Sequence, residues 1–559
     1  MANLVEVRDL RVEARTDSGR RVEIIRGVDL DIAPGEVLAL IGESGSGKTT
    51  IALSLMGHLR PGCRIVGGSV RVDGKDMAAL SQRELGKLRG TTVAYIPQSA
   101  AAAFNPAQTL MQQVIEVAQI HALMPAAEAR ARAVALFRDL ALPKPETIGE
   151  RYPHQVSGGQ LQRASAAMAL IGSPKLVIFD ELTTALDVTT QIEVLRAFKK
   201  MMRLSGAAGV YVSHDLAVVA QIADRIMVLK DGQTQEVGPS ERILSAPAHP
   251  YTRILLAAVE PKPAPPRVDD PAMTPRRPLL EVEQVVAGYG PIGADGQPAT
   301  TAVKAVSLSL ERGHNFGIIG ESGCGKSTLA RVISGILKPS AGRILFDGRT
   351  LAPDLRQRSR EDLRRLQIVF QLADTALNPS KSVGEIIGRP LAFYHGRRGR
   401  ENEARVEMLL DMVQLPRSAR HRLACELSGG QKQRVNLARA LAAEPEVVIC
   451  DEITSALDTV VTAAIIELLR DLQRELGLSY IFISHDLSMV RSICDRIAVM
   501  YHGEKVAELA PDAFGASQTH PYARRLYASM PKLDRNWLDS LDLAALERAE
   551  SAPAEALRP

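Results

Sequence analysis

Short apolar runs that end in clusters of small or polar residues recur along the chain and predict buried strands. Val37–Ile41 ends in a glycine-rich turn, and the next segment places its apolar residues on one helical face, which predicts a strand, a loop and a helix. The runs Leu176–Phe179 and Val210–Val212 end beside acidic residues and a histidine. Chemical groups at the carboxyl ends of such strands are typical of an open parallel α/β sheet. Residues 98–157 are richer in Ala, Gln and Glu and predict mainly helix.

The whole pattern occurs twice. GESGSGKT at Gly42–Thr49 returns as GESGCGKS at Gly320–Ser327, 278 positions later, and the VSGGQLQR, LVIFDE and SHDL segments each return 271 positions later. This period is too long for a solenoid, so the sequence predicts a duplicated domain. We expect one domain over residues 1–259, a proline-rich linker over 260–278, a second domain over 279–535 and a tail over 536–559.

Composition is that of an ordinary globular protein. Of 559 residues, 46% are hydrophobic and 24% charged, and a net charge of +4 is too small to indicate nucleic-acid binding. The five cysteines form no C-x-x-C pair, which argues against a zinc ribbon or a disulfide framework. Because a membrane span needs about 20 predominantly apolar residues and we find no such stretch, we expect any membrane role to be exercised from the surface.

The G-x-x-x-x-G-K-[ST] segments predict two phosphate-binding loops. Glycines let backbone N–H groups converge on phosphate, and the helix that follows adds the positive end of its dipole. Lys48 and Lys326 are expected to reach the β- and γ-phosphates, while Thr49 and Ser327 offer a hydroxyl to Mg²⁺.

An Asp-Glu pair closes one apolar run in each half. Such a pair alone is common at protein surfaces, but here it follows a phosphate loop in both repeats, which favours a catalytic interpretation. Asp180 and Asp451 are expected to hold Mg²⁺ through water, and Glu181 and Glu452 to act as general bases on the attacking water.

The SGGQ segments predict a second kind of anion site. Ser157 can cap the helix that starts at Gly158, and the two glycines leave its N–H groups accessible. A domain that carries both a phosphate loop and such a distant helix start needs a partner domain, so that one nucleotide is sandwiched between two units.

Taken together, these motifs resemble those of a tandem ATP-binding subunit of the ABC transporters. The resemblance implies an α/β fold: two P-loop NTPase domains in tandem, each with a RecA-like core, an antiparallel β region and a helical subdomain. It implies that two ATP molecules, with Mg²⁺, lie between head-to-tail domains. Gln98 and Gln371 match the Q-loop, and His214 and His485 match the histidine that contacts the γ-phosphate.

The resemblance implies the following roles for residues of this sequence. The catalytic residues are Glu181, His214, Glu452 and His485. The nucleotide-binding residues of the first half are Gly42, Ser44, Gly45, Gly47, Lys48, Thr49, Thr50, Gln98, Ser157, Gly158, Gly159, Gln160 and Asp180. Those of the second half are Gly320, Ser322, Gly323, Gly325, Lys326, Ser327, Thr328, Gln371, Ser428, Gly429, Gly430, Gln431 and Asp451. The Mg²⁺ ligands are Thr49, Gln98, Asp180, Ser327, Gln371 and Asp451.

A narrower resemblance is to the oligopeptide, dipeptide and nickel import ATPases. It rests on GESG in both loops, on FNP at Phe104 and LNP at Leu377, and on HPYT and HPYA near the ends of the domains. It implies an ATPase that energises an importer of peptides or similar small solutes, with two integral-membrane permease subunits and an extracytoplasmic solute-binding protein. The chain would then lie at the cytoplasmic face of the bacterial cell membrane. Peptide, nickel complex and glutathione all remain open as solutes.

Some features depart from the family pattern. Leu182 and Ile453 replace the proline that usually follows the catalytic Glu, and no aromatic residue precedes Tyr95 to stack on adenine, although Tyr289 could do so in the second half. The cysteine-rich segment of some relatives is missing, so we expect no iron–sulfur cluster. His249 and His520 of the HPY motifs are expected to be structural. Cys324 lies in a phosphate loop, where converging N–H groups should favour a reactive thiolate.

The alternative is a ribosome-binding tandem ATPase of translation. Proteins of that class need a long charged helical linker between their domains, whereas the linker here is short and rich in proline. DNA-repair relatives carry zinc-type cysteine pairs, which this sequence lacks.

Overall fold

The computed structural model describes residues 3–15, 19–182, 188–259, 277–293, 296–371, 373–454, 457–516 and 519–542. The chain divides into two compact units. Unit 1 comprises residues 1–259 with 458–460 and 531–541, and unit 2 comprises 260–457, 461–530 and 542–559. Most of the expected linker and tail, residues 260–276 and 543–559, lies outside the described residues. The domain boundaries drawn from the sequence stay predictions.

Unit 1 contains two sheets. An antiparallel sheet has the strand order β2-β1-β4-β5, formed by β1 (Val5–Arg15), β2 (Arg21–Ile32), β4 (Cys63–Val72) and β5 (Lys75–Asp76). A six-stranded sheet has the order β10-β9-β3-β8-β7-β6, formed by β3 (Val37–Ile41), β6 (Val93–Ile96), β7 (Leu176–Asp180), β8 (Ala208–Ser213), β9 (Arg225–Lys230) and β10 (Gln233–Pro239). Its strands are parallel except β10.

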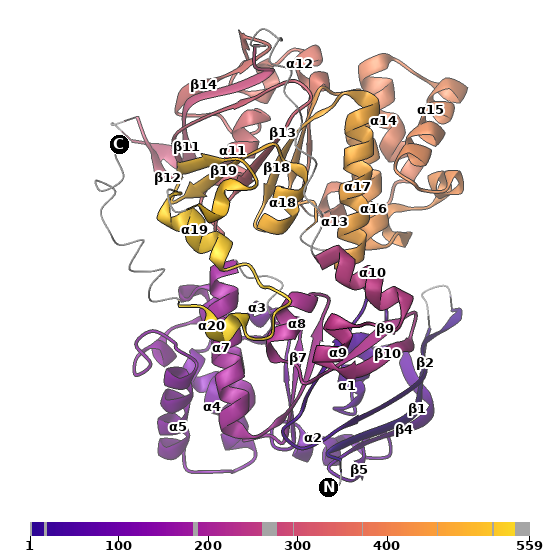
Figure 1. Cartoon of the computed structure of the whole chain (residues 1–559), viewed down its shortest axis with the longest axis vertical. Helices are drawn as coiled ribbons and strands as arrows, with labels where there is room; N and C mark the ends of the chain where they lie inside the picture. The colour runs from indigo at the N-terminus through magenta and orange to yellow at the C-terminus, as the bar shows by residue number, and fades with distance from the viewer. Residues whose placement is uncertain are drawn as a thin grey trace. The chain divides into compact units, whose positions relative to one another are not determined.

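Helices complete unit 1. They are α1 (Lys48–Ser54), α2 (Gln82–Leu88), α3 (Ala100–Ala103), α4 (Leu110–Ile120), α5 (Ala126–Asp139), α6 (Gly158–Leu170), α7 (Val188–Ser205), α8 (Leu216–Ile222), α9 (Ser240–Ser245), α10 (Pro250–Val259) and α20 (Trp537–Ser540). Within the unit, α4 and α5 lie on the side away from the antiparallel strands β1 and β2 (Figure 1). The mainly helical interpretation of residues 98–157 is confirmed by α3, α4 and α5.

Unit 2 repeats this architecture. Its antiparallel sheet has the order β12-β11-β14-β15, formed by β11 (Leu280–Ile292), β12 (Pro298–Leu310), β14 (Ala341–Phe346) and β15 (Arg349–Thr350). Its six-stranded sheet has the order β16-β17-β18-β13-β19-β20, formed by β13 (Asn315–Ile319), β16 (Leu366–Val369), β17 (Val447–Asp451), β18 (Ser479–Ser484), β19 (Arg496–Tyr501) and β20 (Glu504–Leu509). Its helices are α11 (Lys326–Ile333), α12 (Arg360–Arg365), α13 (Ala373–Ala376), α14 (Val383–His395), α15 (Gly399–Met412), α16 (Gly429–Leu441), α17 (Thr459–Leu476), α18 (Leu487–Ile493) and α19 (Pro521–Ala528).

The central strands show why the apolar runs form a sheet core. Every residue of β3, β7 and β8 is buried, and so is every residue of β13, β17 and β18. A strand covered on both faces is apolar along most of its length, which a continuous apolar run supplies and an alternating pattern does not. In the described parts of both units, the helices include none long and apolar enough to cross a bilayer.

Candidate functional site

Each phosphate loop joins a central strand to a helix, as its sequence predicts. Gly47 and Gly325 precede α1 and α11 with φ of 97° and 103°, a left-handed conformation that glycine adopts without strain. Lys48 Nζ donates hydrogen bonds to the carbonyl oxygens of Gly42 (2.7 Å) and Glu43 (2.8 Å). Lys326 makes the equivalent two bonds within its own loop. The ammonium group is therefore held beside the helix start, where backbone N–H groups favour an anion.

A hydroxyl and a carboxylate meet beside each loop. Thr49 Oγ1 donates to Asp180 Oδ1 at 3.1 Å, and Ser327 Oγ donates to Asp451 Oδ1 at 2.9 Å. Burial raises the pKa of both aspartates above its ordinary value. Oxygen donors of this kind suit Mg²⁺, which takes few protein ligands when phosphates supply the others. Among the described residues there is no cluster of three or more His, Cys, Asp or Glu that could hold a metal by itself.

The glutamate after each aspartate adopts an unusual backbone conformation. Glu181 and Glu452 have φ of 50° and 48°, and their N–H groups donate to the carbonyls of Val212 (2.9 Å) and Ile483 (2.8 Å). Left-handed backbone costs energy for a residue with a side chain and persists where the surroundings enforce it. The same backbone conformation and the same hydrogen bond to the neighbouring strand therefore orient both glutamates.

A glutamine and a histidine contact each glutamate. Gln98 Nε2 donates to Glu181 Oε2 at 2.7 Å, and His214 Nδ1 lies 3.4 Å from Glu181 Oε1. In unit 2, Gln371 Nε2 donates to Glu452 Oε2 at 2.6 Å, and His485 Nδ1 lies 3.7 Å from that oxygen. Each unit thus gathers a lysine, hydroxyl, aspartate, glutamate, glutamine and histidine at one edge of its sheet.

The charges of these groups interact. Burial alone would raise the pKa of Glu452, but the neighbouring His485 brings that pKa below its ordinary value. In turn, the contact with Glu452 outweighs burial and raises the pKa of His485. Burial would lower the pKa of His214, but Glu181 raises it overall. Burial lowers the pKa of Lys48.

The SGGQ segments begin a separate helix in each unit. Ser157 caps α6 and Ser428 caps α16, each in a reciprocal pair of hydrogen bonds with the glutamine three residues later, Gln160 or Gln431. A Cβ on Gly158 would meet nothing within 4 Å, whereas a Cβ on Gly159 would lie 2.1 Å from Thr190 Cγ2. Gly158 therefore leaves the helix start accessible, while Gly159 allows α7 to approach closely.

The remaining predicted nucleotide-binding residues lie in these same segments. Gly42, Ser44, Gly45 and Thr50 belong to the loop and first turn of α1, and Gly320, Ser322, Gly323 and Thr328 to those of α11. Gly429 and Gly430 begin α16. The roles assigned to all these residues stay predictions.

The HPY motifs contribute a contact that sequence reasoning missed. Tyr522 is fully buried, and its hydroxyl accepts a hydrogen bond from the backbone N–H of Glu321 in the phosphate loop, at 3.0 Å. In unit 1, burial and Glu43 of the corresponding loop raise the pKa of Tyr251. His520 Nδ1 and His249 Nδ1 accept bonds from the N–H groups of these tyrosines. These bonds agree with the expected structural role of the two histidines.

Tyr95 on β6 was also missed as a site residue. Its hydroxyl donates to Asp180 Oδ2 at 2.8 Å. Burial and the charge of Asp180 raise the pKa of Tyr95, so the phenol stays protonated and acts as a donor.

Tyr289, the residue of unit 2 that could stack on adenine, is 43% exposed. It lies beside the first turn of α11, with its hydroxyl 3.3 Å from Thr328 Oγ1. The tenth residue of β1, which corresponds to Tyr289 on β11, is Ala14.

The prediction of a reactive thiolate at Cys324 is wrong. Cys324 is 5% exposed, and burial raises the pKa of its thiol, despite Lys326 Nζ at 3.8 Å from Sγ. Desolvation of a thiolate therefore outweighs the attraction of the lysine.

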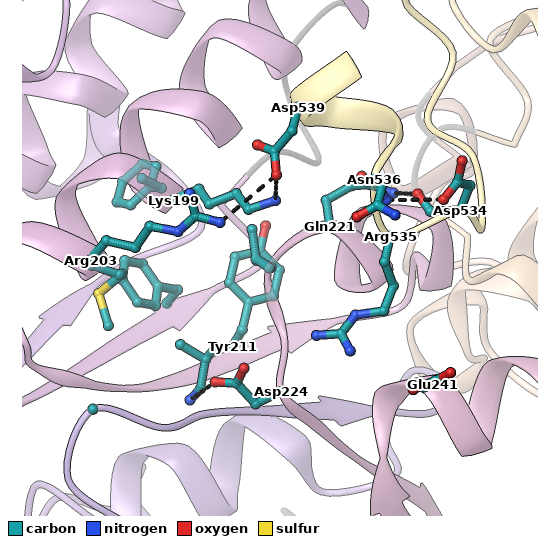
Figure 2. Close-up of a pocket in the computed structure, with 16 residues that line it drawn as sticks. Lys199, Arg203, Tyr211, Gln221, Asp224, Glu241, Asp534, Arg535, Asn536 and Asp539 are labelled. Carbon is teal, nitrogen blue, oxygen red and sulfur yellow. Dashed lines mark hydrogen bonds and ion pairs between the residues drawn. The ribbon is translucent and has the colours of Figure 1, made fainter. Parts of the chain in front are cut away.

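A pocket of about 640 Å³ in unit 1 is lined by none of the predicted site residues. Helix α7, strand β8 and the segment Asp534–Asp539 surround it. Asp539 faces Lys199 and Arg203, with a distance of 2.7 Å from its Oδ2 to Lys199 Nζ, and Tyr211 lies below them (Figure 2). Chain residues near the C-terminus therefore build part of unit 1.

The fold and motifs define an ATP-binding cassette protein, and comparison with known families agrees. Residues 25–184 and 303–455 match the ABC transporter family, and residues 235–285 match the C-terminal region of oligopeptide/dipeptide transporters. The chain belongs to the ABC transporter family, as two ATPase domains in tandem, and is an enzyme that binds ATP and couples its hydrolysis to transport.

The chain matches two relatives along nearly the whole length of each protein. The chain is 37% identical to the glutathione import ATP-binding protein GsiA of Escherichia coli O157:H7, over 95% of this chain and 90% of that protein. It is 39% identical to the peptidoglycan transport ATP-binding protein YejF of Agrobacterium fabrum, over 94% of this chain and 96% of that protein. The particular group is therefore the importer ATPases of the peptide, dipeptide and glutathione type.

Proposed function

We propose that this chain energises an importer of peptides or of small peptide-like solutes. The observation that carries the proposal is the joint match to ATPase domains and to the C-terminal region of oligopeptide/dipeptide transporters. The names of two relatives support it, since glutathione is a tripeptide and peptidoglycan contains peptide stems. These relatives are transport proteins, so the ribosomal alternative has no support from them.

The site residues would act on ATP as follows. The loop N–H groups and Lys48 or Lys326 would bind the β- and γ-phosphates. Thr49 with Asp180, and Ser327 with Asp451, would hold Mg²⁺ with Gln98 and Gln371 as further ligands, and bound Mg²⁺ would neutralise phosphate charge. Glu181 and Glu452 would accept a proton from the attacking water, while His214 and His485 orient the γ-phosphate.

Two ATP molecules would be bound between head-to-tail domains. Each phosphate loop would then face the SGGQ segment of the other domain, whose capped helix offers N–H groups to the γ-phosphate. Since each glutamine contacts the catalytic glutamate, Gln98 and Gln371 are suited to report hydrolysis to a permease.

The partners in this proposal are two integral-membrane permease subunits and, through them, an extracytoplasmic solute-binding protein. The chain would act as a peripheral protein at the cytoplasmic face of the bacterial cell membrane. Neither nucleic acid nor an iron–sulfur cluster has a part in the proposal.

Affinity purification of the tagged chain from solubilised native membranes tests the proposal. We expect two hydrophobic permease subunits to co-purify, and the binding protein encoded beside them to bind a peptide or glutathione. Co-purification of ribosomal proteins without a permease would overturn the proposal.

A further inference from the structure

The two metal-binding aspartates have different surroundings. In unit 1, both carboxylate oxygens of Asp180 accept a hydrogen bond, Oδ1 from Thr49 Oγ1 and Oδ2 from Tyr95 Oη at 2.8 Å. In unit 2, Asp451 Oδ1 accepts the equivalent bond from Ser327. The residue that corresponds to Tyr95, third in its strand, is Ile368, which has no group to donate.

Sheet register explains how the tyrosine reaches the aspartate. Tyr95 on β6 pairs with Ile178 on β7, and Asp180 follows two residues later on the same strand. Side chains two residues apart share one face of a sheet, so a long side chain at Tyr95 meets Asp180. Ile368 pairs with Ile449 in the same register relative to Asp451. The strand register is thus the same in both units, and the side chain that faces the aspartate from the neighbouring strand differs.

We propose that Tyr95 is a positioning residue for the metal site of unit 1, and that unit 2 lacks the equivalent hydrogen bond because Ile368 takes the place of the tyrosine. A hydrogen bond on Oδ2 fixes the rotation of the Asp180 carboxylate and leaves Oδ1 beside Thr49, where the metal would be held. Partners of ligating carboxylates typically change metal affinity 10–100-fold when they are removed. The inference rests on the proposed function, because it requires that these aspartates serve a metal–nucleotide complex.

The test measures Mn²⁺ binding to the full-length chain by electron paramagnetic resonance, with adenylyl imidodiphosphate as the nucleotide. Lys326→Ala removes nucleotide binding at the phosphate loop of unit 2, so that the Mn²⁺ signal comes from unit 1. Lys48→Ala removes it in unit 1, so that the signal comes from unit 2. In the Lys326→Ala background, Tyr95→Phe removes one hydroxyl and keeps the ring. We expect Tyr95→Phe to weaken Mn²⁺ binding by about 10–100-fold relative to the Lys326→Ala variant alone.

Two matched variants separate positioning from a general loss of structure. In the Lys48→Ala background, Tyr95→Phe is expected to leave the Mn²⁺ affinity of unit 2 unchanged, whereas Ile368→Tyr is expected to raise it. Unchanged affinity of unit 1 in Tyr95→Phe, or an equal loss in both backgrounds, overturns the inference. If neither background binds Mn²⁺ with the nucleotide, the proposed function fails first, and that result is distinguishable from a failure of Tyr95 alone.

Discussion

The contact between Glu452 and His485 makes the stability of unit 2 depend on pH. The pKa of Glu452 is lowered, so its contribution is present above about pH 4.3, its unfolded pKa, and is lost as the pH falls through the folded value. The pKa of His485 is raised, so its contribution is present below about pH 6.5 and is lost as the pH rises through the folded value. The window of full stabilisation lies between those two limits.

His485→Gln is therefore expected to lower the melting temperature near pH 6 and to have less effect at pH 9. An ion pair of this kind contributes roughly 1 kcal/mol, which corresponds to about 2–4 °C in a unit of this size. Thermal unfolding followed by circular dichroism at the two pH values measures the difference. An effect that grows toward pH 9 would contradict the assigned contact.

A second prediction at this scale concerns the thiols. Cys425 is exposed, whereas Cys324 is buried and its pKa raised. Because the thiolate is the reacting form, an alkylating reagent at pH 7.5 should label Cys324 roughly tenfold or more slowly than Cys425. Mass spectrometry of timed samples gives both rates. Labelling of Cys324 as fast as Cys425 would restore the reactive-thiolate hypothesis.

At the scale of elements, the helix that begins at Ser157 gives a matched pair of variants. A methyl group on Gly159 would collide with Thr190 of α7, but one on Gly158 meets open space. Overpacking typically costs about 1–3 kcal/mol, so Gly159→Ala should destabilise the chain by that amount and Gly158→Ala should not. Urea denaturation compares the two. Equal stability of both variants would contradict the predicted collision between the added methyl group and the Thr190 side chain.

The segment of residues 531–541, which belongs to unit 1, gives a second matched pair of variants. Leu538 is fully buried, its N–H donates to Gln221 Oε1 at 3.1 Å, and Arg196 Nη2 donates to its carbonyl oxygen at 3.0 Å. Leu538→Ala is expected to cost about 2–5 kcal/mol, while Leu204→Ala, at a site 66% exposed, should change stability by less than about 0.5 kcal/mol. Urea denaturation measures both. A neutral Leu538→Ala would mean that the segment does not pack on unit 1.

Local motifs account for the parts of the site that the sequence predicts. Both phosphate loops and the Ser157 and Ser428 caps are short segments whose geometry depends on residues within a few positions. The helices of residues 98–157 follow from composition in the same way. Such features need no knowledge of what packs against them.

Long-range contacts account for what sequence reasoning missed. Tyr522 meets Glu321 from 201 positions away, and Leu538 meets Gln221 from 317 positions away. Tyr95 reaches Asp180 only because β6 and β7 pair in one register. No periodicity or motif spacing encodes these partners, and the Cys324 prediction erred because it considered the loop without its burial.

At the scale of the whole molecule, the central claim is that both halves carry a competent ATPase site. Each half presents the same lysine, aspartate, glutamate, glutamine and histidine at one sheet edge. The residues around this set differ between the two halves, for example Tyr95 against Ile368 and Ala14 against Tyr289. The repeat therefore predicts shared chemistry with unequal metal and adenine binding.

The most direct measurement is the steady-state ATPase rate of the double variant Glu181→Gln plus Glu452→Gln, with ATP binding measured in parallel. A positioned general base contributes about 10²–10⁴-fold, so the rate is expected to fall by that factor while ATP binding remains. Each single variant should keep part of the activity. A double variant that hydrolyses ATP at the wild-type rate would contradict the account.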